Sequence, residues 1–91
     1  MKIVFRIFDN DASRAQRTES MLYENMKANH IDGNVSQVFC IQEFGRQGVT
    51  SLPALELNGI MLSQEVPLTE VMLADTCARL ASALKKMGIS S

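Results

Sequence analysis

The stretch GVTSLPALELNG, residues 48–59, decides the fold because it leads an apolar run directly into a turn sequence. Ala54-Leu55-Glu56-Leu57 precedes the turn, Asn58-Gly59 forms it, and Ile60-Met61-Leu62 follows it. Asparagine and glycine both accept the positive φ angles of a type I′ turn, which joins neighbouring antiparallel strands. We therefore expect a β-hairpin here, with Pro53 directly before its first strand.

Toward the N-terminus, the sequence predicts a strand followed by a helix. Residues 2–8 are β-branched or aromatic and apolar at nearly every position, as in a strand buried on both faces. Asp9-Asn10-Asp11 follows, and one of its aspartates is expected to cap the helix. The helix should run from Ala12 to about Asn29, a segment without Gly or Pro. Its apolar stripe has helical spacing and consists of Ala15, Thr18, Leu22 and Met26.

Beyond this helix, the sequence predicts a turn, a second strand and a short helix. Residues 30–33 end the first helix, with Gly33 near the position of a left-handed C-cap. Residues 34–40 form a more polar strand that suits a sheet edge. Residues 41–47 resemble a single helical turn, which Gly48 stops.

The last predicted element is a helix that Pro67 opens and Gly88 closes. Lys85 and Lys86 lie near its negative C-terminal end. Its core stripe is Leu73, Cys77, Leu80 and Leu84. The order is therefore β-α-β-(α)-β-β-α, an α/β fold. A strand–helix–strand unit gives a parallel pair, and the hairpin completes a four-stranded mixed sheet flanked by helices, with strand order 2-1-3-4.

Composition excludes several classes of protein. The chain has 91 residues, which suits one domain over residues 1–88 with a C-terminal tail at 89–91. A net charge of −1 argues against nucleic acid as the partner, and no apolar run is long enough to span a membrane. Cys40, Cys77 and His30 are too few for a zinc site or a disulfide framework, so no metal or cofactor is expected. The sequence favours a reducing, cytoplasmic compartment.

The segment of residues 48–59 resembles the "GV-x-S-x-PAL-x-x-NG" segment of small archaeal and bacterial thioredoxin/glutaredoxin-like proteins, the redox-active disulfide protein type. The resemblance extends over nearly the whole chain and implies a thioredoxin-like fold. It also implies a cis peptide bond before Pro53, whereas the alternative is a trans proline that begins an edge strand. In the family, a Cys-x-x-Cys lies at the start of the first helix, where the helix N-terminus lowers the pKa of the leading thiol and makes it a nucleophile. The resemblance therefore implies a role in cell redox homeostasis.

This chain lacks the family's two thiols. Ala12-Ser13-Arg14-Ala15 occupies the Cys-x-x-Cys positions, and Phe8-Asp9-Asn10-Asp11 replaces the small glycine-containing turn before it. Dithiol–disulfide exchange requires a thiolate, so it cannot occur at this site. Two explanations remain open. Either the fold persists as a redox-inactive binding module, or an oxidoreductase has had both active-site cysteines replaced by alanine.

For the binding module, the resemblance implies a groove that takes a protein or an extended peptide as an added strand. The candidate binding residues are Ser13, Arg14, Thr50, Ser51, Leu52 and Pro53. Thr50 and Ser51 have a second interpretation, in which they only satisfy local backbone groups. Arg14 and Arg17 fall off the apolar stripe and favour a solvated face, with anion binding at the helix start as the alternative.

The two cysteines permit a third hypothesis for the function, an enzyme that uses a single thiol. Cys77 is expected in the core, whereas Cys40 ends the second strand and would be partly exposed. An enzyme that uses Cys40 alone would show a depressed thiol pKa and selective alkylation. Residues 34–40 are expected to form an exposed sheet edge, which could pair with a second copy of the chain. The chain is therefore expected to be a monomer or a weak homodimer.

Overall fold

The computed structural model describes residues 2–88, and the predicted tail at 89–91 lies outside this range. The strands are β1 (Ile3–Phe8), β2 (Gly33–Val38), β3 (Ala54–Leu57) and β4 (Ile60–Gln64). The helices are α1 (Ala12–Ala28), α2 (Ile41–Arg46) and α3 (Glu70–Lys86). The chain is therefore an α/β protein with the predicted order of elements.

The strands form one mixed sheet in the order β2-β1-β3-β4, as predicted. β1 pairs parallel with β2 and antiparallel with β3, and β3 pairs antiparallel with β4. A bulge between Leu55 and Glu56 interrupts the last pairing. Asn58 and Gly59 both have positive φ angles, 47° and 88°, so the predicted hairpin turn is confirmed. The Asn58 side chain also accepts from the Val4 N–H at 2.7 Å, which ties the turn to β1.

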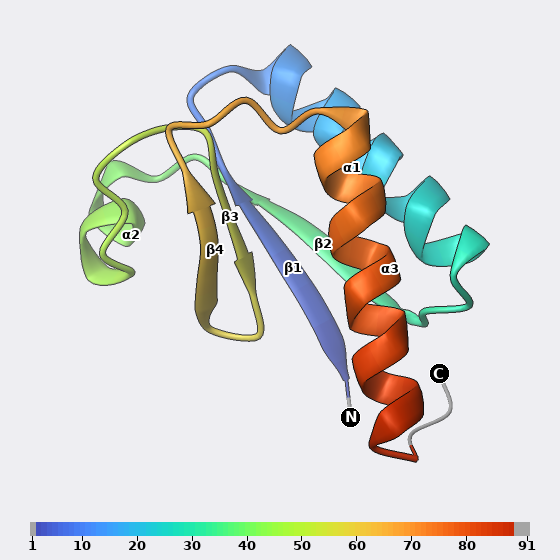
Figure 1. The fold of residues 1–91 in the computed structure, drawn as a ribbon. Coiled ribbons are helices and arrows are strands. Elements are labelled where there is room, and N and C mark those ends of the chain that lie inside the picture. The colour runs from blue at the N-terminus through green and yellow to red at the C-terminus, as the bar shows by residue number, and fades with distance from the viewer. Residues whose placement is uncertain (1, 89–91) are drawn as a thin grey trace.

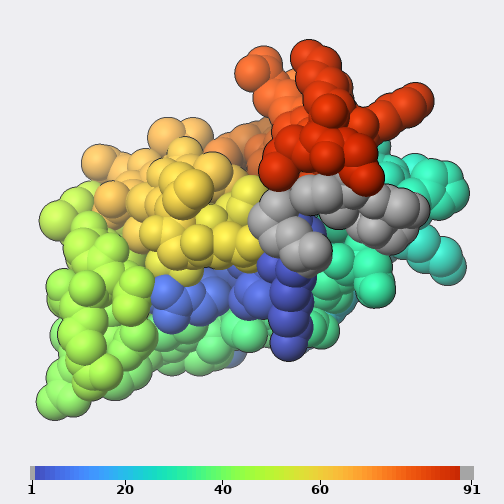
Figure 2. Space-filling view, turned by 90° about the horizontal axis from the view of Figure 1, so that it is seen from below, coloured from blue at the N-terminus to red at the C-terminus, as the bar shows by residue number. Residues whose placement is uncertain are grey.

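Two helices cover one face of the sheet and the third lies on the other side (Figure 1). α1 and α3 pack together over the first face, and Figure 2 shows α2 and the C-terminal end of α3 at opposite sides of the strands. The core between the sheet and the two long helices contains the apolar residues of both predicted helical stripes except Leu80, and Thr18 of the first stripe is also buried. It comprises Ile3, Phe5, Ile7, Ala15, Leu22, Met26, Ile31, Val35, Leu55, Leu68, Leu73, Cys77 and Leu84. Leu80 is only partly buried against it.

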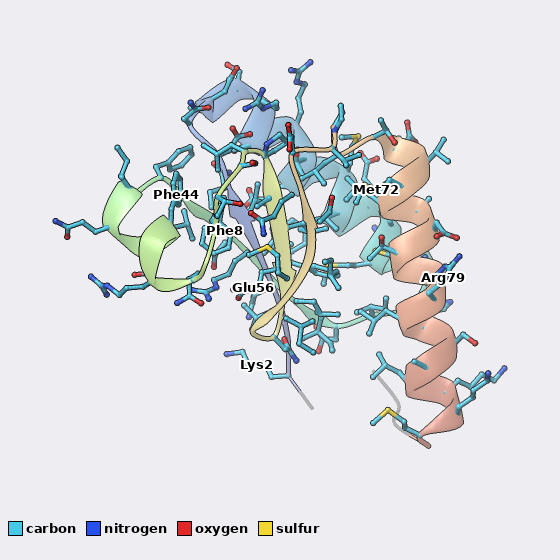
Figure 3. All side chains as sticks on the ribbon, turned by 60° about the vertical axis from the view of Figure 1, so that its left-hand side comes forward. Lys2, Phe8, Phe44, Glu56, Met72 and Arg79 are labelled. Carbon is cyan, nitrogen blue, oxygen red and sulfur yellow. The ribbon has the colours of Figure 1, made fainter. Side chains whose placement is uncertain are left out.

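The face of the sheet toward α2 is less fully covered than predicted. Phe8 on β1 meets Phe44 on α2 edge to face, with ring centroids 5.8 Å apart (Figure 3). Arg6 on β1 is half-buried and donates to both carboxylate oxygens of the buried Glu56 on β3, at 2.7 and 2.8 Å. β1 is therefore not buried on both faces along its length, because a six-residue helix covers only part of the second face.

The first helix ends about where it was predicted to end, but the cap role predicted for Gly33 and the helix start predicted at Pro67 are wrong. His30 adopts the left-handed conformation after α1, with φ 56°, and Gly33 begins β2 instead. A Cβ atom on Gly33 would lie 2.5 Å from the Ile3 carbonyl oxygen, so glycine is needed for close approach of two strands. At α3, Thr69 is the N-cap and accepts from the Met72 N–H, so Pro67 lies in the connection before the helix.

Candidate functional site

A groove of about 710 Å³ opens beside Pro53. Three segments converge on it at the end of the sheet where β1 leads into α1 (Figure 1): the first half of α1, the segment before β3, and the connection from β4 to α3. Its lining residues are Arg14, Gln16, Arg17, Thr18, Ser20, Met21, Leu52, Pro53, Glu65, Pro67 and Leu68. Pockets of this size accommodate small molecules or several peptide side chains.

The groove brings together half of the predicted binding residues. Arg14, Leu52 and Pro53 line it, whereas Ser13 is exposed outside the lining. Thr50 and Ser51 also lie outside the lining. Their backbone N–H groups both donate to Oε1 of Gln64 on β4, at 2.8 and 3.3 Å. This agrees with the second interpretation of Thr50 and Ser51, in which they satisfy local hydrogen bonds.

The residue before Pro53 presents free backbone groups. The peptide bond between Leu52 and Pro53 is cis. The Pro53 carbonyl accepts from the Glu65 N–H at 3.0 Å, which fixes the β4–α3 connection against this segment. Within residues 2–88, neither the N–H nor the C=O of Leu52 has a hydrogen-bond partner. Leu52 therefore offers both a donor and an acceptor at the side of the groove.

A buried ion pair organises the turn between β1 and α1. Asp9 is fully buried and accepts from the N–H groups of Asn10 and Asp11, at 2.8 and 3.3 Å. Arg14 donates to both of its carboxylate oxygens, with Nε 2.8 Å from Oδ2. Asp11 caps the helix, and its Oδ1 accepts from the Arg14 N–H at 3.0 Å. The turn is thus held by two aspartates with separate tasks.

Opposing effects set the pKa of Asp9. Burial alone would raise this pKa, but the hydrogen bonds from Arg14, Asn10 and Asp11, together with the Arg14 charge, lower it below its ordinary value. The Arg14 pKa is raised in turn, first by its hydrogen bond to Asp9. The prediction that Arg14 belongs to a solvated face is therefore incomplete. Its side chain is 41% exposed, but its guanidinium is paired with the buried Asp9.

Ala12 and Ala15, at the two positions where the resemblance would place cysteines, differ in environment. Ala12 is the exposed first residue of α1, and Ala15 is fully buried one turn later. Cys77 is also buried, and burial raises the pKa of its thiol, so the predicted core position is confirmed. Cys40 is exposed before α2 and is not among the residues that line the groove.

Three other features of the described residues concern clusters of metal ligands, membrane-spanning helices and contacts of the β2 edge. Residues 2–88 contain no group of three or more His, Cys, Asp or Glu side chains placed to hold a metal ion. None of the helices in that range has the length and apolarity needed to cross a membrane. At the β2 edge, the Val35 N–H donates to the Tyr23 hydroxyl at 3.0 Å, so one backbone group of this edge is already satisfied.

Sequence reasoning missed the Asp9–Arg14 pair and the contribution of the β4–α3 connection to the groove. Asp9 follows directly after a strand of buried residues, which is a weak indication of a buried carboxylate in need of a partner. Glu65 and Pro67 gave no comparable indication. No protein-family model and no curated protein matches the chain.

Proposed function

We propose that the chain is a thioredoxin-like domain that binds an extended segment of a partner protein beside Pro53, without dithiol–disulfide exchange. The main support is Leu52, whose unpaired N–H and C=O border a groove that contains both apolar and polar side chains. An extended segment that pairs with these two groups would place its side chains alternately toward and away from the groove. The mixed sheet with order β2-β1-β3-β4 is compatible with the family resemblance.

The absence of thiols from this end of α1 supports the redox-inactive form of the proposal. Ala12 and Ala15 have no nucleophilic side chain, and exchange requires a thiolate. Cys40 and Cys77 lie outside the groove lining, and Cys77 is buried. The proposed module would therefore contribute binding alone.

One observation favours the second candidate, a thiol–disulfide oxidoreductase with both cysteines replaced by alanine. Ala12 is exposed at the helix start and Ala15 is buried one turn away, so position 12 could present a thiol to a substrate while position 15 stayed covered. The variant Ala12→Cys/Ala15→Cys separates the two candidates. A reduction potential of about −270 to −200 mV with turnover of insulin disulfides would favour the enzyme. If the two introduced cysteines form no disulfide, or form a disulfide without turnover of insulin, binding would remain as the proposed function.

Binding itself is tested on the unaltered chain. Random decapeptides displayed on phage are selected against it, and the selected peptides are synthesised and titrated into ¹⁵N-labelled protein. We expect the amide signal of Leu52 to shift and its hydrogen exchange to slow. Leu52→Asp should abolish binding, whereas Leu62→Asp, on β4 and outside the groove lining, should not. Peptides that bind while leaving the Leu52 amide unchanged, or selection of none, would contradict the proposal.

A further inference from the structure

The groove contains two charged side chains of opposite sign that are left without partners. Three charged residues line it, namely Arg14, Arg17 and Glu65. Arg14 is neutralised by Asp9. Within residues 2–88, Arg17 and Glu65 form no ion pair, either with each other or with another side chain. The free charge of the groove is therefore one guanidinium and one carboxylate.

These two charges come from different elements. Arg17 lies on α1, and Glu65 lies on the connection between β4 and α3. The backbone of Glu65 is fixed by its N–H bond to the Pro53 carbonyl and has a φ of 69°, a conformation uncommon for residues other than glycine. Glu65 is thus held beside the groove even though a glycine would adopt this backbone more readily.

Apolar side chains line the groove together with these charges. Met21 and Leu52 are partly buried and Leu68 is buried, and all three line the groove. An apolar side chain placed against them would remove their remaining apolar surface from water, at roughly 25 cal/mol per Å². The lining therefore suits an apolar residue with charged neighbours rather than a uniformly charged ligand.

We propose that the partner segment has an apolar residue flanked by an acidic residue on one side and a basic residue on the other. The acidic residue would pair with Arg17 and the basic residue with Glu65, and the opposite charges would set the direction of the segment. This inference rests on the proposed binding function and specifies the chemistry of the partner. A carboxylate suits Arg17 better than a phosphate does, because a dianion would meet only one free guanidinium and the repulsive carboxylate of Glu65.

Charge exchange between protein and peptide tests the proposal. The peptides selected on the unaltered chain are labelled and their affinities measured by fluorescence anisotropy at low and high salt. Arg17 is exposed, and loss of an exposed ion pair weakens binding by up to about fivefold. Arg17→Glu also adds a repulsion, so it should weaken binding by about threefold to tenfold. Changing the peptide's acidic residue to lysine should restore the affinity of that variant and weaken binding to the unaltered chain. Glu65→Lys should behave in the same way toward the peptide's basic residue, and salt should reduce both effects.

The control is Arg79→Glu, which reverses a charge on the exposed side of α3, outside the groove lining (Figure 3). It should leave affinity unchanged. Peptides that bind beside Leu52 but ignore the changes at Arg17 and Glu65 would overturn this inference and leave the proposed function intact. Tighter binding when phosphoserine replaces the acidic residue would overturn the assignment of a carboxylate. Failure to select any peptide would overturn the inference together with the proposed function.

Discussion

The two partners of the Asp9–Arg14 ion pair should differ in what their removal costs. Asp9 is fully buried, whereas the Arg14 side chain is 41% exposed. After Asp9→Asn, the guanidinium can turn toward water, so the main loss is that of charge-assisted hydrogen bonds, about 1.5–3 kcal/mol. After Arg14→Gln, a buried carboxylate remains without its counter-charge, and the expected cost rises to about 3–5 kcal/mol. Arg14→Gln should therefore be the more destabilising substitution.

The contribution of Asp9 should also depend on pH. Its pKa is lowered in the folded protein by hydrogen bonds that outweigh burial, whereas an unfolded chain has an Asp pKa of about 3.9. A lowered folded-state pKa gives stabilisation that is complete above the unfolded pKa and is lost as pH falls through the folded pKa. The stability difference between the unaltered chain and Asp9→Asn should thus be constant from pH 7 to about pH 5 and shrink below about pH 4.

Urea unfolding followed by circular dichroism at a series of pH values measures both effects. Asp75→Asn is the matched control, because Asp75 forms an exposed pair with Arg79 and should lose no more than about 0.5 kcal/mol. The reasoning is refuted if Asp9→Asn costs as much as Arg14→Gln. A stability difference for Asp9→Asn that stays constant from pH 5 to pH 3 would likewise show that Asp9 is not ionised and paired as the structure has it.

Three further predictions concern packing, thiol reactivity and the face of the sheet toward α2. Gly33→Ala should cost about 1–3 kcal/mol in chemical denaturation because its Cβ would meet β1 backbone, whereas Gly45→Ala, with open space around it, should stabilise by about 0.5–1 kcal/mol; equal effects would contradict the close approach. Iodoacetamide should modify Cys40 in the native protein and Cys77 only after unfolding, as mass spectrometry of the adducts would show, and early labelling of Cys77 would contradict its burial. Glu56→Gln should lower stability by about 1.5–3 kcal/mol in urea unfolding, because it removes the charge from a bidentate pair with β1; an unchanged midpoint would rule out that contribution.

The fold was predictable where short segments determine it. Asn58-Gly59 specifies a turn by its own backbone preferences, and the helical spacing of the α1 stripe needs no tertiary information. The errors at Gly33 and Pro67 arise where two explanations fit the same residue. Glycine serves a left-handed cap or a close approach, and proline opens a helix or lies in the connection before it.

The site was less predictable because its contacts join residues from different elements. Gln64 satisfies Thr50 and Ser51 from fourteen and thirteen positions away, and no periodicity indicates that pairing. Glu65 lines the groove from the β4–α3 connection, and its N–H is bonded to the Pro53 carbonyl. The resemblance implies a binding role for the residues before Pro53 in general. Only the tertiary structure distinguishes the free backbone of Leu52 from the backbone N–H groups of Thr50 and Ser51, which are hydrogen-bonded.

The charges around the start of α1 bear on whether a thiol there, as the proposed thioredoxin-like function would imply for an enzyme, could be activated. A helix N-terminus lowers a thiol pKa because its partial positive charge and free N–H groups favour a thiolate. Here the Asp11 carboxylate already lies at the N-terminus of α1 and accepts from the Arg14 N–H. The Arg14 guanidinium is neutralised by Asp9. A thiol at position 12 would meet a helix start whose favourable charge is already engaged. The two aspartates already engage the positive groups that would otherwise lower the pKa of a thiol at this turn. The presence of the aspartates therefore agrees with the presence of alanines instead of cysteines at positions 12 and 15.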